Sequence, residues 1–206
     1  MKRFINVNIQ MLIYKDISEN RIYCYIHIPK NSGKFIREKI KNNINYEVLN
    51  DYWGVQKVFD IDMAHIPFMV RNKYIHNTEI DNYYTYTRNP YNRIISGFFY
   101  KNPECKKEDF KIFVKNELTK MVFDQSFEKN IIHYFPQYMF LCNQDLIIKD
   151  NIKTYKLENN DLNIDGLNIR EYNLRDYYDT EILSIINEIY KKDFELFDYK
   201  MISDFC

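Results

Sequence analysis

The sequence predicts an α/β fold of P-loop-like type, in which a central, mostly parallel sheet lies between helices in a three-layer α/β/α arrangement. Two segments, residues 21–42 and 81–100, each begin with a β-prone run and pass through a short break into a helix-like stretch. Strands that alternate with helices along a chain are typical of parallel sheets covered on both faces. Ligands of such sheets bind at the carboxyl ends of the strands.

The first segment is a strand–loop–helix unit. Residues 21–28 are rich in Ile and Tyr and predict the first central strand. Residues 29–33 begin with Pro and end with Gly, which breaks the strand. Residues 34–42 then carry apolar side chains at helical spacing among charged ones.

The second segment repeats this order. Residues 81–87 predict a strand, and Asn89 and Pro90 interrupt it. Residues 91–100 predict a helix whose apolar face is formed by Ile94, Ile95, Phe98 and Phe99. Pro90 suits the first helical turn, where its missing N–H has no partner to lose.

Weaker patterns complete the prediction. Residues 180–192 predict the strongest helix, with one stripe of Ile and Leu. The other expected elements are strands at 4–12, 55–63, 145–149 and 153–157, and helical segments over 108–138 around a loop at 124–126. The chain has few Gly and Pro and no Ser/Gly-rich hinge, which predicts a single domain over residues 1–206.

The bulk composition limits the function classes. Lys and Arg total 29, as do Asp and Glu, so the formal net charge of zero argues against a general binder of nucleic acid or anionic membranes. The four cysteines form no CxxC pair, which favours reduced thiols over a zinc site. No signal peptide or long apolar stretch is recognisable, so we expect a cytoplasmic protein; a trimmed form of a membrane-anchored protein stays open.

The loop at 29–33 has the properties of a phosphate-binding turn. Lys30 adds a positive charge, Gly33 allows close approach of the backbone, and the following helix contributes its dipole. It is no Walker A loop, because Ile28 and Phe35 stand where Gly and Ser or Thr are needed. A nucleotide kinase with a divergent loop is therefore disfavoured. Taken alone, the loop is only suggestive, because a Lys-Asn-Ser-Gly turn is common and is usually just a turn.

The second strand ends at Arg88, and Ser96 follows 96 − 88 = 8 residues later. A guanidinium held there can bind a phosphate, with the hydroxyl beside it. The alternative is that Arg88 pairs with a surface carboxylate and Ser96 packs beside Gly97. Both loops in this order favour the functional interpretation, in which they hold both phosphate ends of one nucleotide.

Several segments resemble motifs of the sulfotransferases that use 3′-phosphoadenosine 5′-phosphosulfate (PAPS), in particular carbohydrate sulfotransferases of the family 2 type. Residues 28–33, Ile-Pro-Lys-Asn-Ser-Gly, resemble the 5′-phosphosulfate loop, and residues 88–96 resemble the 3′-phosphate motif Arg-Asn-Pro-x-x-Arg-x-x-Ser. Residues 133–137 are similar to a His-x-x-Pro-Gln segment, 155–158 to the strand after it, and 189–199 to the C-terminal Tyr-x-x-Asp-Phe-x-x-Phe-x-Tyr.

The resemblance implies PAPS as sulfate donor, with no metal. Lys30 would neutralise the leaving phosphate, Phe35 would stack on adenine, and Arg88 would bind the 3′-phosphate. The full implied donor site is Lys30, Asn31, Ser32, Gly33, Lys34, Phe35, Arg88 and Ser96. Ser32 and Lys34 depart from the motif, so Lys34 either supplies charge or marks a weakened donor site.

The resemblance also implies a general base for the acceptor hydroxyl. His65, in a His-x-Pro segment after a predicted strand, is the catalytic candidate beside Lys30. A structural role for His65 is nearly as good an explanation, and Glu47 and Asp51 are weaker rivals. For Arg93 an internal ion pair is favoured over a phosphate contact.

The expected function is transfer of a sulfuryl group from PAPS to a hydroxyl of a carbohydrate or glycoconjugate. The partners are thus a small-molecule donor and a carbohydrate acceptor, without nucleic acid or membrane. The alternative is a catalytically weakened protein of this fold that binds nucleotide or glycan without turnover.

Overall fold

The computed structural model describes residues 12–51, 55–56, 61–62, 65, 68, 79–124, 128, 130–143, 145, 147–148, 151–160, 164–167 and 169–205. The chain forms two compact units. The first unit comprises Met1–Ile28, Gly33–Thr85 and Met139–Lys153, and the second comprises Pro29–Ser32, Tyr86–Tyr138 and Thr154–Cys206. Each unit is thus assembled from segments that are distant in sequence.

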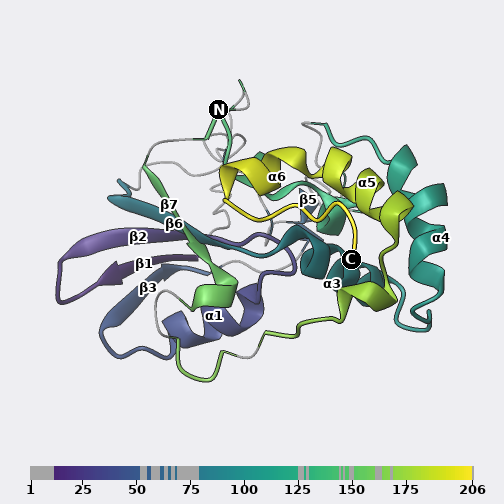
Figure 1. Cartoon of the computed structure of the whole chain (residues 1–206). Coiled ribbons are helices and arrows are strands. Elements are labelled where there is room, and N and C mark those ends of the chain that lie inside the picture. The colour runs from purple at the N-terminus through teal and green to yellow at the C-terminus, as the bar shows by residue number, and fades with distance from the viewer. Residues whose placement is uncertain are drawn as a thin grey trace. The chain divides into compact units, whose positions relative to one another are not determined.

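Figure 1 shows the described strands and helices. The strands are β1 (Leu12–Asp16), β2 (Arg21–Ile26), β3 (Tyr46–Asn50), β4 (Val55–Gln56), β5 (Ile61–Asp62), β6 (Asn82–Thr87) and β7 (Ile152–Lys156). The α-helices are α1 (Gly33–Lys41), α3 (Pro90–Lys101), α4 (Asp109–Asn116), α5 (Thr180–Ile189) and α6 (Lys191–Leu196). Short 3-10 helices cover Leu118–Lys120, Ile132–Tyr134, Gln137–Phe140, Leu157–Asn159 and Leu174–Asp176.

The structure is mixed α/β, and its main sheet has five strands in the order β3-β1-β2-β6-β7. β2 and β6 pair in parallel, whereas β1 pairs antiparallel with both β2 and β3. The sheet is therefore mixed, and the prediction of a mostly parallel sheet was wrong.

The turn between β1 and β2 explains the antiparallel pairing. A connection this short can only reverse the chain, because parallel neighbours need a long crossover. The Asp16 carboxylate accepts hydrogen bonds from the backbone N–H groups of Ser18 (2.9 Å) and Glu19 (3.1 Å), and Asn20 takes a left-handed φ of 54°. These are the interactions typical of tight turns.

The two strand–loop–helix units were predicted to within a few residues. β2 and β6 lie inside the predicted strands 21–28 and 81–87, and they pair in parallel from Tyr23↔Asn82 to Ile26↔Thr85. The parallel pairing places the ends of both strands at the same edge of the sheet. The predicted helix at 180–192 instead ends at Ile189, and α6 begins two residues later.

Two other predicted strands differ from the structure. The strand expected at 55–63 is replaced by two short antiparallel strands, β4 and β5, and the one expected at 145–149 by an isolated bridge between Cys142 and Ile148. Most of the strand expected at 4–12, and part of the loop at 124–126, lie outside the described residues. β1 and β3 were not predicted as strands. Each is only five residues long and includes charged or polar residues, so its β pattern is weak.

Capping side chains fix the helix starts in the second unit. The Asn89 side chain accepts a hydrogen bond from the Tyr91 N–H, and Pro90 is the first residue of α3, as expected from the sequence. The Asp179 carboxylate accepts from the Ile182 N–H at the start of α5. Cap interactions of this kind stabilise a helix by about 1 kcal/mol each.

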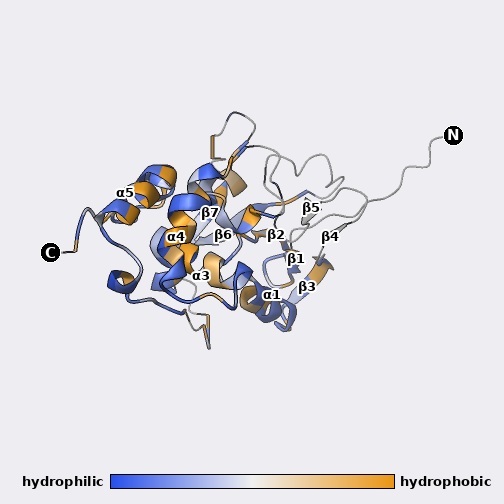
Figure 2. Cartoon of the chain, turned by 90° about the vertical axis from the view of Figure 1, so that its right-hand side faces the viewer, coloured by the Kyte–Doolittle hydropathy of each residue, from blue (hydrophilic) through white to orange (hydrophobic). Residues whose placement is uncertain are grey.

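The core of the second unit is rich in aromatic rings. Phe98 on α3 packs against Phe110 (5.5 Å between ring centroids) and Phe113 (5.1 Å) on α4. α5 buries Ile182, Leu183 and Ile186 in the same core, and its two-sided character is visible in Figure 2. The amphipathic helices thus pack their apolar faces into one cluster.

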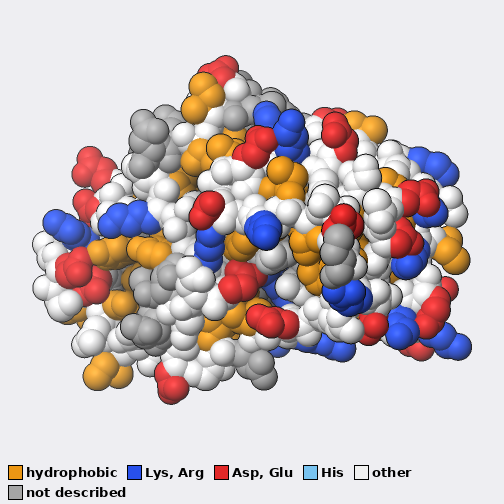
Figure 3. All heavy atoms as spheres, viewed as in Figure 1, with side chains coloured by type: hydrophobic (Ala, Val, Ile, Leu, Met, Phe, Trp, Pro, Cys, Tyr) orange, Lys and Arg blue, Asp and Glu red, His pale blue; other side chains and the backbone are white. Residues whose placement is uncertain are grey.

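Charges on the surface are mixed. Figure 3 shows acidic and basic side chains interspersed over the viewed face of the molecule. This agrees with the balanced totals of the sequence. In the described part of the chain, no helix is both long and apolar enough to span a bilayer.

Candidate anion-binding site

The backbone of the loop after β2 alternates in handedness. Lys30 (φ 69°) and Ser32 (φ 55°) are left-handed, whereas Asn31 between them is not. A left-handed conformation is unfavourable for side chains other than Gly and is maintained only where the surroundings enforce it. Left-handed residues also occur in the backbone nests that bind anions, in which successive N–H groups point toward one side.

The Asn31 side chain anchors this loop. It is fully buried, and its Nδ2 donates hydrogen bonds to the Tyr86 carbonyl (2.6 Å) and to Oε1 of Gln137 (2.8 Å). Asn31 was predicted to bind the donor. That contact, through the backbone N–H, stays a prediction; the side chain holds the loop to the end of β6, and its Oδ1 is buried without a hydrogen-bond partner among the described residues.

Gln137 joins the loop to the residue that follows β6. Its Oε1 accepts from the Arg88 N–H (2.9 Å), and its Nε2 donates to the Arg88 carbonyl (2.8 Å). The Gln137 backbone N–H in turn donates to the Asp193 carboxylate (2.7 Å). The sequence resemblance marked residues 133–137, but it gave Gln137 no role.

Arg88 is 4% exposed. Its Nη1 donates to the Lys30 carbonyl (3.1 Å) and its Nη2 to the Arg170 carbonyl, while its Nε is buried without a partner among the described residues. Burial lowers the Arg88 pKa, and Tyr172 and Glu158 counteract the shift. The expected alternative, a surface pair with a carboxylate, does not fit a guanidinium buried against backbone carbonyls.

Arg93 is fully buried on α3. Its Nε donates to the Pro29 carbonyl (3.0 Å), yet Nη1 and Nη2 have no hydrogen-bond partner within the part of the chain that the structure describes. Burial lowers its pKa, the Asp193 charge raises it, and the Arg88 charge lowers it further. The internal ion pair favoured from the sequence is not formed at hydrogen-bond distance with any described carboxylate, and the buried Asp193 acts on Arg93 only through its charge.

Lys30 completes the group of cations. Its Nζ lies 3.9 Å from the centroid of the exposed Tyr100 ring. Partial burial, followed by the charges of Arg88 and Arg93, lowers the Lys30 pKa to about 8. The charges of Arg88 and Arg93 thus add to burial in disfavouring the protonated form of Lys30.

Three further polar residues of the second unit are Ser96, Glu158 and Asp193. Ser96 is half-buried on α3, and the hydrogen bonds of the described residues give its hydroxyl no protein partner. The Glu158 carboxylate accepts from the Asn89 N–H (2.7 Å) and the Tyr199 hydroxyl (3.0 Å). Asp193 is fully buried, and burial raises its pKa to about 6 against the opposing effect of Arg93.

Lys30, Arg88 and Arg93 together form a group that we call the cationic cluster. A buried charged group without hydrogen-bond partners is unfavourable by several kcal/mol. Among the described residues, three guanidinium nitrogens of the cluster, one on Arg88 and two on Arg93, have no hydrogen-bond partner. Phosphate and sulfate oxygens are the acceptors that such donors bind best, so the cluster is chemically suited to an oxyanion.

Three other predicted donor-site residues belong to the first unit. Gly33 begins α1, and a Cβ built on it would lie 1.8 Å from the His27 ring. Gly33 is therefore required for packing against His27, a contact that the sequence did not reveal. Lys34 is exposed, and Phe35 is half-buried with the Lys39 Nζ 5.4 Å from its ring centroid.

His65, the predicted base, also belongs to the first unit. It is 7% exposed, and its Nδ1 lies 3.2 Å from the His27 carbonyl oxygen. Because a carbonyl only accepts hydrogen bonds, this contact favours the tautomer with the proton on Nδ1 and the lone pair on Nε2. That tautomer is the one a base acting through Nε2 requires. The rival Glu47 lies exposed on β3, and Asp51 is engaged in ion pairs.

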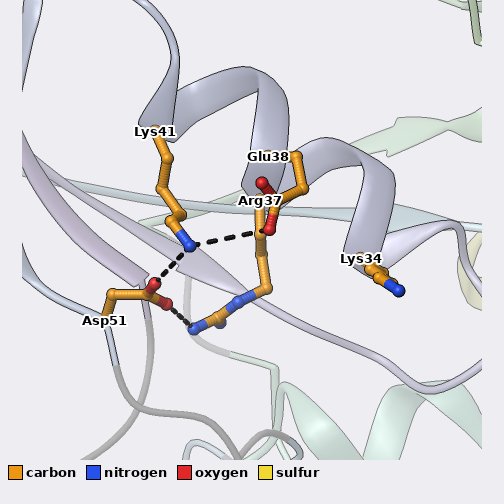
Figure 4. A pocket seen from close by; sticks show the side chains of 5 residues that line it. All are labelled: Lys34, Arg37, Glu38, Lys41 and Asp51. Carbon is orange, nitrogen blue, oxygen red and sulfur yellow. Dashed lines mark hydrogen bonds and ion pairs between the residues drawn. The ribbon is translucent and has the colours of Figure 1, made fainter.

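Asp51 lies in a charged pocket of about 200 Å³ beside α1 (Figure 4). It pairs with Arg37 and with Lys41 (3.0 Å), and Lys41 also approaches Glu38 (3.5 Å). Lys34 lines the same pocket but points away from these pairs. Four of the five lining side chains thus form one network of ion pairs.

Among the described residues, no group of three or more His, Cys, Asp or Glu is arranged to hold a metal ion. No family model, curated protein or solved structure shows significant similarity to the chain. The evidence for function therefore consists of the sequence motifs and the geometry of the cationic cluster.

Proposed function

We propose that the protein is a PAPS-dependent sulfotransferase, whose acceptor is a hydroxyl group of a carbohydrate or glycoconjugate. The observation that carries the proposal is the cationic cluster, in which buried N–H groups of Arg88 and Arg93 have no hydrogen-bond partner in the part of the chain that the structure describes. These are the residues that the two motif-like segments contribute. The proposal includes the three-layer, P-loop-like form of the fold.

The residues present suit a nucleotide that carries two anionic ends. Lys30 and the loop backbone would hold the 5′ end, and Arg88 and Ser96 the 3′-phosphate. When bound, the donor supplies the sulfuryl group. Lys30 then stabilises the negative charge that develops on the leaving phosphate, a contribution of the kind that dominates phosphoryl-type transfers.

The acceptor hydroxyl has to lose a proton as its oxygen bonds to sulfur. His65 is proposed to accept this proton at Nε2, because its Nδ1 faces the His27 carbonyl. Replacement of His65 by Gln is expected to lower kcat by about 10²–10⁴-fold, the range typical of general-base catalysis, without weakening nucleotide binding.

The second candidate is a protein of the same fold that binds the nucleotide without turnover. It is favoured by the state of Arg88, whose two Nη atoms already donate to the Lys30 and Arg170 carbonyls. It is also consistent with an exposed Lys34 in place of the hydroxyl residue of the motif.

Two measurements separate the candidates. Sulfate transfer from PAPS to a panel of glycans, followed by mass spectrometry, is expected for the enzyme and absent for the binder. Thermal stabilisation by adenosine 3′,5′-bisphosphate is expected for both and should be lost in Arg88→Ala. Lys101→Ala, which removes an exposed charge from the end of α3, is the matched control. No stabilisation of the wild type would contradict both candidates.

A further inference from the structure

We propose that Gln137 is a positioning residue that fixes the spacing between the Lys30 loop and Arg88, so that two phosphate groups of one nucleotide are bound together. This inference rests on the proposed function, because it assumes a ligand with two anionic ends. Gln137 itself is not expected to touch the ligand, since it is fully buried and occupied by the protein.

The Gln137 amide makes three hydrogen bonds to the two elements that carry the cations. Its oxygen accepts from Asn31 Nδ2 (2.8 Å) and from the Arg88 N–H (2.9 Å), which uses both lone pairs. Its nitrogen donates to the Arg88 carbonyl (2.8 Å). The bond between Asn31 and Gln137 spans 106 residues of sequence, and that between Arg88 and Gln137 spans 49. One amide therefore contributes three of the hydrogen bonds that join two separate chain segments.

Gln137 is held in place from its other side. Its N–H donates to one oxygen of the Asp193 carboxylate (2.7 Å), and the Tyr138 N–H donates to the other (2.9 Å). Asp193 is fully buried on α6. The position of Gln137 is thus set by the helix that carries the C-terminal motif.

Spacing matters for a ligand with two anionic ends. Once one end is bound, the second binds as if at high local concentration, but only if both protein groups lie where the ligand can reach them together. Such avidity reaches about 10²–10⁴-fold and is lost when the geometry fails. Deletion of the Gln137 amide removes three of the hydrogen bonds between the two segments, while those from Asn31 to the Tyr86 carbonyl and from Arg88 to the Lys30 carbonyl remain.

The test compares ligands that use one anionic end with a ligand that uses both. Calorimetry at fixed ionic strength gives Kd for adenosine 5′-phosphate, adenosine 3′-phosphate and adenosine 3′,5′-bisphosphate. For the wild type we expect the bisphosphate to bind at least about 100-fold more tightly than either monophosphate. For Gln137→Met this gain is expected to fall below about tenfold, while Kd for each monophosphate changes by less than about threefold.

Ile182→Ala, a cavity-forming change in the core of the same unit, is the control for general destabilisation, and it should keep the full gain. Gln137→Asn, which keeps an amide but withdraws it by one methylene, gives the same comparison if Gln137→Met fails to fold. An undiminished gain in a folded Gln137 variant overturns the positioning role and leaves the proposed function intact. A wild type without any gain for the bisphosphate overturns both.

Discussion

The guanidinium of Arg88 donates a hydrogen bond to the backbone carbonyl of Lys30, 3.1 Å away, although 58 residues separate them in sequence. The two residues follow β2 and β6, which are parallel neighbours. The contact brings together the two segments that the sequence suggested as the ends of one nucleotide site. Because Nη1 carries two N–H groups, a phosphate bound at Arg88 would share this nitrogen with the carbonyl.

Arg88→Lys is expected to weaken the binding of adenosine 3′,5′-bisphosphate by about tenfold or more. Lysine keeps the charge but loses the planar set of donors that reaches two acceptors at once. Calorimetric titration of the variant measures the loss. An affinity equal to that of the wild type would show that Arg88 acts only as a distant charge.

Nucleotide affinity is expected to fall as pH rises through 8. The Lys30 pKa is lowered to about 8, so Lys30 loses its proton near that pH in the protein without ligand. Above this pH, binding of an anion requires that the Lys30 amine takes up a proton again. Phosphate groups, with a second pKa of about 6, no longer change charge there. We expect Kd at pH 9 to be about tenfold higher than at pH 7, since one proton is taken up on binding.

Lys30→Arg provides the control for this pH dependence, because arginine stays protonated throughout the range. Titrations of the variant at pH 7, 8 and 9 should give nearly constant affinities. A variant that weakens in parallel with the wild type would assign the pH dependence to another group.

Gly33→Ala is expected to destabilise the protein by about 1–3 kcal/mol, the usual cost of overpacking. The added Cβ would meet the His27 ring at 1.8 Å, so the ring has to move. Urea denaturation measures the loss. In a His27→Ala background the same change should cost much less, and an equal cost in both backgrounds would mean that the contact is not responsible.

Asp193 is expected to make stability depend on pH between about 4 and 6. Its pKa in the folded protein is about 6, above its ordinary value of 3.8. The folded state therefore binds more protons than the unfolded state in this window, so the free energy of unfolding falls as pH rises through it. The fall is roughly 3 kcal/mol at most, at 1.36 kcal/mol per pKa unit.

Asp193→Asn lacks the titrating group and should not show this fall. Urea denaturation of both proteins at several pH values between 4 and 7 gives the difference directly. Parallel pH profiles would show that Asp193 is already ionised in the folded protein at pH 4.

The sequence was informative where local chemistry decides the structure. The breaks at Pro29 and Pro90 and the β-prone runs before them located both loops, and the parallel pairing of neighbouring strands brings Lys30 and Arg88 together. The sheet was mispredicted because a short turn, rather than a helix, connects β1 to β2.

Residues whose roles depend on tertiary contacts could not be identified in the same way. Gln137 acts through partners 49 and 106 residues away, and nothing local distinguishes it from any other glutamine. Arg93 lies on the buried face of α3, where an ion pair was the natural expectation, yet its Nη atoms lack described partners. Gly33 was predicted to allow close approach of an anion, and the His27 ring gives a further reason for its lack of a side chain that the sequence did not reveal.

A crystal structure with adenosine 3′,5′-bisphosphate tests the nucleotide site most directly. We expect one phosphate within hydrogen-bond distance of Lys30 Nζ and the loop N–H groups, the other at Arg88, and at least one Nη atom of Arg93 in contact with a ligand oxygen. A nucleotide bound away from these three cations, or none at saturating concentration, would contradict the assignment.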